Sequence, residues 1–288
     1  MIECIDRLDA LRARIAAWKR DGRRIGLVPT MGNLHAGHHA LVRLARAQAD
    51  VVVASVFVNP TQFGAGEDLA RYPRTPKTDV EGLDAAGCDL AWMPAVETMY
   101  PLGLAQAVQV RVPGITDVLE GAQRPGHFDG VCTVVARLLN QVQPEVAAFG
   151  RKDYQQLVVV RHLVRDMSFA VEVRAGDTVR EADGLAMSSR NQYLSPGERA
   201  TAPGLHQSLL AMREGVHAGH ALAAIESQAR AQLTRAGFNV DYAALRTPEL
   251  GEPEAGRAGP LVALVAARLG RTRLIDNLEI PWPPAPIL

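Results

Sequence analysis

Short apolar segments alternate with amphipathic segments over the first 180 residues of the chain. The apolar segments are rich in valine and have the length of buried strands, and the segments between them place apolar residues at helical spacing. Strands that are apolar on both faces and alternate with helices are typical of a parallel sheet covered on both sides. The pattern predicts strands at residues 25–29, 51–58, 90–93, 146–149 and 171–173, and helices at residues 41–49, 78–86, 131–142 and 154–167.

The pattern changes after about residue 183. The segment Ser195-Pro196-Gly197-Glu198 predicts a helix start, because serine suits the N-cap, proline suits the first helical position and glutamate completes a capping box. Helices are predicted from there to about residue 215 and over residues 218–236. Strands are predicted at residues 238–245, 261–267 and 273–280.

Together these patterns predict an α/β protein of two domains. Residues 1–183 would form a Rossmann-like, doubly wound parallel sheet domain, and residues 184–288 would form a smaller α+β domain. In doubly wound sheets, ligands bind beyond the carboxyl ends of the strands, where the strand order reverses. Candidate site residues are therefore expected in the loops that follow the predicted strands.

Composition fits an ordinary globular protein, with 48% hydrophobic and 22% charged residues among 288. The 31 Lys and Arg residues balance the 31 Asp and Glu residues, which argues against nucleic-acid binding through general attraction to phosphates. The sequence shows neither a signal peptide nor an apolar run of about 18 residues, so a cytoplasmic protein without membrane contact is predicted. Cys4, Cys88 and Cys132 are widely spaced, which fits neither a disulfide framework nor a zinc site.

The first candidate site is the segment Met31-Gly32-Asn33-Leu34-His35-Ala36-Gly37-His38, directly after an apolar run. A strand, a glycine turn and a helix start are the layout of a nucleotide-phosphate site, because the first N–H groups of a helix lack partners within it. His35 and His38 are three residues apart, so they share one face and can reach the same anion. The alternatives are an ordinary helix start and a zinc site, but no third zinc ligand is apparent.

Two further loops place polar side chains after predicted strands. Asn59 and Gln62 follow the strand predicted at residues 51–58, which Pro60 prevents from continuing, and an amide can donate to one substrate oxygen and accept from a hydroxyl. An ordinary Asn-Pro turn is the alternative.

The segment Gly150-Arg151-Lys152-Asp153-Tyr154-Gln155-Gln156 leads from a strand into a helix, where Lys152 would favour an anion. A solvated Lys-Asp cap is the alternative there.

The fourth candidate is Met187-Ser188-Ser189-Arg190-Asn191, where the two predicted domains meet. Two hydroxyls and a guanidinium can clamp a phosphate, because arginine binds phosphate oxygens bidentately. A serine-rich linker is the alternative, and the frequent location of ligand sites between domains favours the clamp. His127 is expected to belong to a structural turn before the helix at residues 131–142, and His39 is expected to point away from the site.

In this order, the four segments resemble the pantothenate synthetases, or pantoate–β-alanine ligases, of the HxGH nucleotidyltransferase superfamily. The pattern His-x-Gly-His alone indicates only the superfamily, whereas the four segments together are specific to the family. The resemblance is carried by residues 29–38, 57–63, 149–156 and 187–191, and it extends along nearly the whole chain through residues 68–74 and 274–277.

The resemblance implies an ATP-dependent ligase of vitamin B5 and coenzyme A biosynthesis. Such an enzyme joins (R)-pantoate to β-alanine through a bound pantoyl adenylate and releases AMP and pyrophosphate. ATP would be a co-substrate together with Mg²⁺, with no metal held by protein side chains. The resemblance further implies a homodimer and a C-terminal domain that acts as a lid.

Site residues are also implied by the resemblance. His35, His38, Lys152 and Arg190 would be catalytic, with His38 as the proton donor. Gln62, Gln156 and Asn59 would bind pantoate, and Gln62 would also lie near β-alanine. ATP would be bound by Met31, Gly32, Asn33, Leu34, His35, Ala36, Gly37, His38, Gly150, Arg151, Lys152, Asp153, Val179, Met187, Ser188, Ser189 and Arg190.

The residues by themselves leave two other functions open. A nucleotidyltransferase that leaves AMP or CMP on its product would use the same His-x-Gly-His segment. A nucleotide-binding regulatory module would need no reaction at all. The identity of the nucleotide product distinguishes a ligase from the first alternative, and substitution of His38 distinguishes it from the second.

Overall fold

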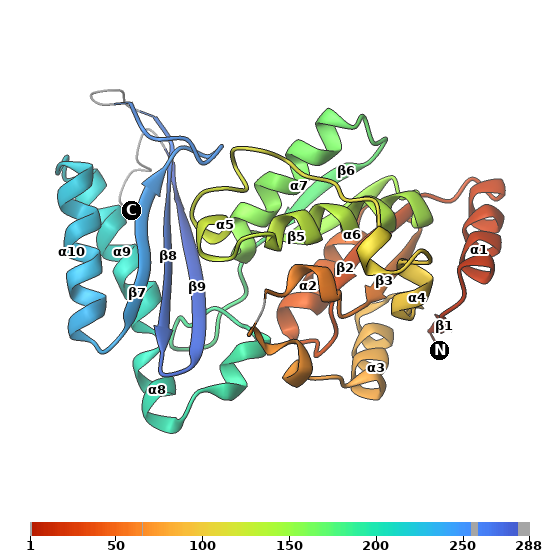
Figure 1. Cartoon of the computed structure of the whole chain (residues 1–288), viewed down its shortest axis with the longest axis horizontal. Helices are drawn as coiled ribbons and strands as arrows, with labels where there is room; N and C mark the ends of the chain where they lie inside the picture. Colours follow the sequence, from red (N-terminus) through yellow and green to blue (C-terminus); the bar gives the residue numbers. More distant parts are fainter. Residues whose placement is uncertain (1, 65, 255–258, 282–288) are drawn as a thin grey trace. The chain divides into compact units, whose positions relative to one another are not determined.

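The computed structural model describes residues 2–64, 66–254 and 259–281, and Figure 1 shows its helices and strands. The chain divides into two compact units. The first comprises Met1–Arg151 and Gln156–Asp177, and the second comprises Lys152–Gln155 and Thr178–Leu288. The domain boundary between residues 183 and 184 stays a prediction.

A six-stranded parallel sheet forms the centre of the first unit (Figure 1). Its strand order is β1-β4-β3-β2-β5-β6, so the order reverses at β2, which pairs with β3 on one side and β5 on the other. This arrangement confirms the predicted doubly wound sheet. The strands are β1 (Glu3–Ile5), β2 (Ile25–Thr30), β3 (Val51–Val56), β4 (Leu90–Trp92), β5 (Val146–Gly150) and β6 (Glu172–Gly176).

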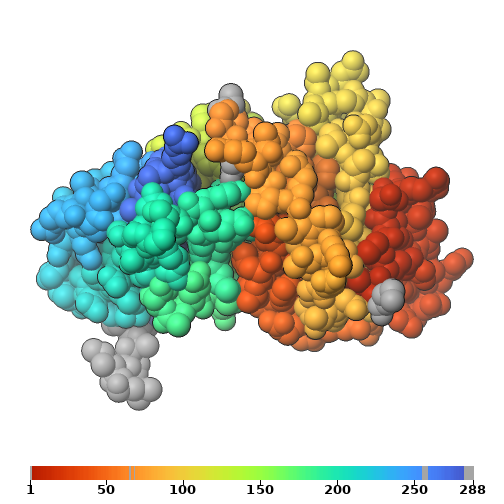
Figure 2. All heavy atoms as spheres, turned by 90° about the horizontal axis from the view of Figure 1, so that it is seen from below, coloured from red at the N-terminus to blue at the C-terminus, as the bar shows by residue number. Residues whose placement is uncertain are grey.

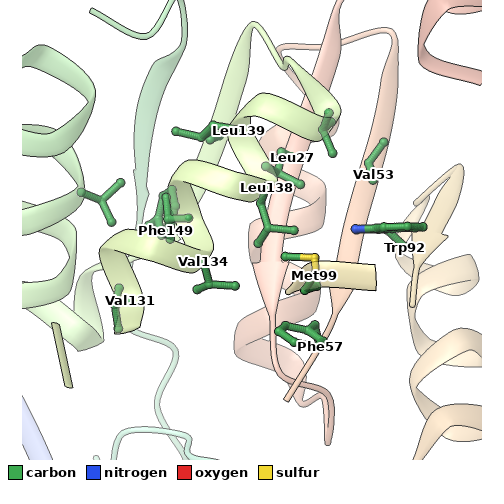
Figure 3. Close-up of a cluster of buried hydrophobic side chains, with 14 of the residues drawn as sticks. Leu27, Val53, Phe57, Trp92, Met99, Val131, Val134, Leu138, Leu139 and Phe149 are labelled. Carbon is green, nitrogen blue, oxygen red and sulfur yellow. The ribbon is translucent and has the colours of Figure 1, made fainter. Parts of the chain in front are cut away.

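Helices cover both faces of this sheet. Leu27 of β2 belongs to the same apolar core as Leu138 of α6 (Figure 3), whereas the next residue, Val28, belongs to a second core with Leu41 of α2 and Leu83 of α3. Burial on both faces explains why the strands are apolar throughout. The α-helices of this part of the chain are α1 (Leu8–Arg20), α2 (Ala36–Arg46), α3 (Pro76–Ala86), α4 (Val96–Met99), α5 (Glu120–Gln123), α6 (His127–Val142) and α7 (Tyr154–Asp166).

The sequence prediction missed β1 and α1. β1 has three residues, of which only Ile5 is buried, so no strand pattern can develop. α1 does carry a helical stripe of buried residues, Leu11, Ile15 and Trp18, which could have been found from its spacing. Both elements lie before β2 in the chain, and β1 pairs with β4 at the edge of the sheet.

The second unit contains helices and an antiparallel sheet of three strands. The strands occur in the order β7-β8-β9, and β8 and β9 form a hairpin in which Leu269 is paired with Thr272. The α+β character and the hairpin were both predicted. The elements are α8 (Pro196–Thr201), α9 (Gly204–His217), α10 (Leu222–Arg235), β7 (Asn239–Arg246), β8 (Leu261–Leu269) and β9 (Thr272–Ile280).

The single helix predicted from residue 196 to about residue 215 was wrong, because the structure divides it into α8 and α9. Pro203 lies between them, lacks an N–H group, and would clash with the preceding turn in the interior of a longer helix. The predicted capping box is confirmed. The Ser195 N–H donates to Glu198 Oε2 at 2.8 Å, and the Glu198 N–H donates to Ser195 Oγ at 3.4 Å.

All three cysteines are free thiols, with Cys4 exposed and Cys88 and Cys132 buried. Burial raises the pKa of Cys88 and of Cys132 to about 12, so both thiols stay protonated at neutral pH. Within the described ranges, no helix combines the length and the apolar character needed to span a membrane.

Candidate active site

The turn between β2 and α2 contains two consecutive residues with left-handed backbone conformations. Gly32 has a φ of 83° and Asn33 a φ of 51°. Glycine adopts such a φ without strain, and a Cβ at Gly32 would lie 3.0 Å from Asp79 Oδ2. His35 then forms the N-cap of α2, and His38 is the third residue of the helix. The sequence placed both histidines on the first helical turn, whereas His35 precedes the helix.

The two imidazoles cap the helix that carries them. Nδ1 of His38 accepts from the His35 N–H at 3.3 Å, and Nδ1 of His35 accepts from the Gly37 N–H at 3.2 Å. A neutral imidazole that accepts at Nδ1 carries its proton on Nε2. The ring centroids are 4.1 Å apart. The backbone therefore fixes the tautomer of both rings, and each has an Nε2–H donor.

The backbone amides of this turn are engaged within the chain. The Gly32 N–H donates to Thr30 Oγ1 at 3.3 Å, and the N–H groups of Asn33 and Leu34 donate to the two carboxylate oxygens of Asp79 at 3.1 and 2.8 Å. Together with the two amides bonded to the imidazoles, five N–H groups have partners in the protein. The sequence predicted free amides at this helix start. An anion bound here would instead meet imidazole donors.

The loop after β3 brings Asn59 and Gln62 beside Met31. The Asn59 Nδ2 donates to Gln62 Oε1 and to the Gly130 carbonyl, both at 3.1 Å, while Asn59 Oδ1 accepts from the Tyr100 hydroxyl at 2.6 Å. The Gln62 Nε2 donates to Met31 Sδ at 2.8 Å. Asn59 is only 1% exposed. Its bonds therefore fix the direction of the Gln62 amide in the short helix η1 (Pro60–Gln62).

A second set of side chains fixes the backbone of Gln62. His127 Nδ1 donates to the Gln62 carbonyl at 2.8 Å, and His127 Nε2 accepts from Arg124 at 3.0 Å. Arg124 also donates to both carboxylate oxygens of Glu67, at 2.8 and 2.7 Å. Burial, followed by the charge of Arg124, lowers the pKa of His127 to about 4. His127 is therefore neutral at pH 7. It contacts the candidate site residue Gln62, whereas the sequence predicted only that it belongs to a structural turn.

Gly130 permits the close packing of α6 against η1. A Cβ at this position would lie 2.3 Å from the Thr61 carbonyl oxygen and 2.6 Å from the Gln62 nitrogen. These atoms belong to the backbone, so they cannot move aside as a flexible side chain would. The absence of a side chain at Gly130 is thus required for the observed position of Gln62.

In the second unit, Lys152 is anchored through its main chain. Asn277 of β9 donates from Nδ2 to the Lys152 carbonyl at 2.8 Å. The Lys152 Nζ lies 3.6 Å from Asp153 Oδ1, and the lysine side chain is 20% exposed. Arg180 forms a bidentate ion pair with the buried Asp276 of the same strand, at 2.7 and 3.0 Å. Asp276 and Asn277, which are adjacent in β9, therefore bind Arg180 and Lys152, which lie in two different segments of this unit.

The predicted phosphate clamp forms an ordered segment of the second unit. The Met187 N–H donates to the Val179 carbonyl at 2.9 Å, so these two residues are paired across a short ribbon. Ser188 then caps the short helix η5 (Ser189–Tyr193), because its Oγ accepts from the Arg190 N–H at 3.2 Å. Asn191 donates to the Ala186 carbonyl at 3.1 Å. These bonds argue against a flexible linker here.

The remaining candidate residues belong to the first unit. Gly150 ends β5, and Arg151 donates to the exposed Asp177 at 3.1 Å. Gln156 lies in the first turn of α7 and is half-buried. The first unit thus contains Met31–His38, Asn59, Gln62, Gly150, Arg151 and Gln156. The second unit contains Lys152, Asp153, Val179 and Met187–Arg190.

Sequence reasoning missed several residues that hold the candidate site. Asp79, Arg124, Glu67 and Asn277 contact its backbone or a residue behind it. Only Asp79 has a clear signal in the sequence, because it occupies an inward position of α3 together with Leu83 and Ala86. A carboxylate on the buried stripe of a helix is unusual enough to call for a partner.

We expect Gly130→Ala to lower the free energy of unfolding by about 1–3 kcal/mol, because the added methyl group overlaps the backbone of η1. Urea denaturation measures this loss. Gly197→Ala is the matched control, since a Cβ at Gly197 in α8 meets nothing within 4 Å. Equal stability of the two variants would contradict the packing described for Gly130.

The pKa of His127 predicts how stability depends on pH. The imidazole titrates at its ordinary value of 6.5 in the unfolded chain and at about 4 in the folded protein. Its contribution to stability is therefore complete above pH 6.5 and is lost as the pH falls toward 4. His127→Asn removes this titration, so urea midpoints should fall less steeply between about pH 6.5 and 4.5 than in the unsubstituted protein. The exposed His217→Asn should leave the slope unchanged.

Comparison with known proteins identifies relatives along almost the full chain. A sequence profile described as Pantoate-beta-alanine ligase matches residues 3–279. The pantothenate synthetase of Stenotrophomonas maltophilia (strain K279a) is 63% identical over 279 residues, which cover 97% of this chain and 100% of that protein. The pantothenate synthetase of Xanthomonas oryzae pv. oryzae (strain MAFF 311018) is 62% identical with the same coverage.

Solved structures agree with these sequence matches. The structure of pantothenate synthetase from Thermus thermophilus is 50% identical, covers 96% of this chain and 99% of its own, and gives a TM-score of 0.90. A pantoate-beta-alanine ligase from Francisella tularensis, complexed with beta-gamma ATP and beta-alanine, is 29% identical, covers 96% of this chain and 97% of its own, and gives a TM-score of 0.81. The chain belongs to the pantoate-beta-alanine ligase family.

Proposed function

We propose that this protein joins (R)-pantoate to β-alanine with ATP and releases pantothenate, AMP and pyrophosphate. Membership of the family supports this activity, and a relative from Francisella tularensis was solved with beta-gamma ATP and beta-alanine. The observation that carries the proposal is the pair His35 and His38. Their Nδ1 atoms are occupied by backbone donors, so both rings have Nε2–H donors for a phosphate.

In the first step, a carboxylate oxygen of pantoate attacks the α-phosphorus of ATP. The bond from this phosphorus to the bridging oxygen of the β-phosphate breaks, and pyrophosphate leaves with the electron pair. Negative charge increases on the phosphate oxygens, and the Nε2–H groups of His35 and His38 stabilise it. As the proton donor to the leaving pyrophosphate, His38 gives it a hydrogen bond from Nε2–H, and the neutral imidazole keeps this proton. The product retained on the protein is pantoyl adenylate.

In the second step, the amine of β-alanine attacks the acyl carbon of pantoyl adenylate. The bond from this carbon to the phosphate oxygen breaks, AMP leaves with the electron pair, and the amine loses a proton as the amide forms. Water competes with the amine for the same carbon. The second unit serves as a lid that excludes water during this step.

Gln62 and Gln156 bind the hydroxyl and carboxylate oxygens of pantoate, and Gln62 also lies near β-alanine. An amide suits this task, because it offers a donor and an acceptor side by side. Asn59 acts on pantoate through Gln62, since it is buried and both ends of its amide are bonded to the protein.

Residues of both units bind ATP in this proposal. Lys152, Ser189 and Arg190 provide charge and hydrogen bonds to the phosphates, and Lys152 and Arg190 stabilise the same transition state as the histidines. The nucleotide contacts the segment of residues 31–38. Further contacts come from Gly150, Arg151, Asp153, Val179, Met187 and Ser188.

Mg²⁺ accompanies ATP in the proposed reaction. Mg²⁺ keeps several waters and is commonly bound through substrate phosphates, where it neutralises charge. The part of the chain that the structure describes has no group of three or more His, Cys, Asp or Glu side chains suited to a metal.

A cytoplasmic homodimer is part of the proposal. The segment of residues 102–108, coloured yellow in Figure 2, lies on the surface of the first unit. Leu102, Leu104 and Val108 are exposed there. Several large apolar side chains on one surface segment favour association with a partner. Sedimentation of the purified protein tests the dimer.

The decisive experiment is exchange of labelled pyrophosphate into ATP. With Mg²⁺ and pantoate present and β-alanine absent, we expect rapid exchange, because the first step is complete and reversible without the amine. Omission of pantoate should abolish the exchange. Folded protein without pantoate-dependent exchange would rule out the adenylate route. After β-alanine is added, free AMP should appear in a one-to-one ratio with the amide, whereas a nucleotidyltransferase would retain the nucleotide on its product.

Two substitutions of His38 separate catalysis from helix capping. Asparagine keeps an acceptor for the His35 N–H but lacks the Nε2–H donor, whereas alanine lacks both. We expect both variants to lose about 100-fold or more in pyrophosphate exchange, as is typical for loss of a donor that stabilises transition-state charge. The exposed His220→Ala serves as the matched control and should retain full activity. Full activity of His38→Asn would limit His38 to a capping role, as in a pure binding module.

A further inference from the structure

The turn that carries His35 and His38 is held partly by bonds from outside it. Gly32 and Asn33 both have positive φ values, and Asn33 is not a glycine. A non-glycine residue in this region is less stable than in the usual regions and persists where its surroundings hold it. The bonds that hold this turn therefore decide where the following imidazoles lie.

Asp79 supplies two of those bonds from another helix. Its Oδ2 accepts from the Asn33 N–H at 3.1 Å, and its Oδ1 accepts from the Leu34 N–H at 2.8 Å. Thr75, at the N-cap of α3, donates from its hydroxyl to the same Oδ1 at 3.1 Å. Both carboxylate oxygens are thus occupied, and the carboxylate bridges α3 and the turn.

The burial of Asp79 indicates that its role is specific. Asp79 is only 2% exposed and shares the inward stripe of α3 with Leu83 and Ala86. An apolar residue at such a position stabilises a helix against its core, whereas burial of a carboxylate costs free energy unless its oxygens are bonded. The partners of Asp79 are two consecutive amides of the turn, directly before His35.

A tight contact between α2 and α3 keeps these two helices close together. A Cβ at Gly82 of α3 would lie 2.6 Å from Nε2 of His39, the residue after His38. The missing side chain at Gly82 allows α3 to approach α2 closely enough for Asp79 to reach the turn. This contact places His39 against α3.

We propose that Asp79 is a positioning residue that orients His35 and His38 for catalysis by holding the amides of Asn33 and Leu34. It acts through the histidines and does not contact substrate. The inference rests on the proposed function for its catalytic consequence, but the holding of the turn can be measured without any activity.

The test compares Asp79→Asn with Asp89→Asn. An asparagine at position 79 keeps one acceptor, so one of the two amides loses its partner. Asp89 is the matched control, because its carboxylate also accepts a backbone N–H, that of Val52 at 2.7 Å, and pairs with Arg46. It precedes β4, at the amino end of the sheet.

Hydrogen exchange of the amides at residues 33 and 34 is the first readout. We expect at least tenfold faster exchange in Asp79→Asn and no change in Asp89→Asn. Unchanged exchange in Asp79→Asn would overturn the proposal. This result does not depend on the reaction, so it separates a failure of this inference from a failure of the proposed ligase activity.

Pantoate-dependent pyrophosphate exchange is the second readout. We expect Asp79→Asn to lower kcat at least tenfold with less than a threefold change in KM for ATP, while Asp89→Asn keeps the unsubstituted kcat. In a background in which His35 and His38 are both alanine, Asp79→Asn should lower kcat by less than threefold, because a residue that acts through these histidines loses its effect when both are absent. An equal loss in both backgrounds would mean that Asp79 is only structural and would overturn the proposal.

Thr75→Val covers the case in which Asp79→Asn does not fold. Valine has nearly the shape of threonine but lacks the hydroxyl that donates to Asp79 Oδ1. We expect changes in the same direction as for Asp79→Asn, with faster amide exchange and lower kcat, each by about two- to fivefold. A fully active Thr75→Val protein with unchanged exchange at residues 33 and 34 would count against the proposal.

Discussion

The central position of β2 is the constraint on which the first unit depends. β2 pairs with parallel neighbours on both edges, and both of its faces are buried under helices. Its carboxyl end is where the strand order reverses, so the chain that leaves it enters the crevice typical of such sheets. The loop after β3 begins beside it, which explains why Met31 and Gln62 meet although they are distant in sequence.

Periodicity in the sequence predicted most of the strands and long helices, although α1 was missed despite its helical stripe of apolar residues. The buried strands and long helices follow from periodicity, and the capping box at Ser195 follows from local chemistry. The division of α8 from α9 depends on Pro203, a residue whose effect local rules already describe. β1 was missed because three residues do not establish a pattern.

For the candidate site, the sequence indicated the residues that carry chemistry and could not indicate how they are held. Histidine, glutamine and lysine after strands are visible as motifs. The partners of Gln62 include Asn59, which is local, but also His127, which is 65 residues away. The amides of Asn33 and Leu34 were expected to be free, because nothing in the sequence links them to a carboxylate 45 residues later. Such partners follow only from the packing of complete helices.

The bond between Asn277 and Lys152 changes how the chain can be divided. All six strands of the parallel sheet lie before residue 178, so a fragment that ends at Asp177 would contain the whole sheet and the histidine turn. It would nevertheless lack the β9 amide that holds the carbonyl of Lys152, at the entry to α7. β9, the last strand in the described part of the chain, therefore anchors a loop near the middle of the sequence, and a fragment with the parallel sheet alone lacks this anchor.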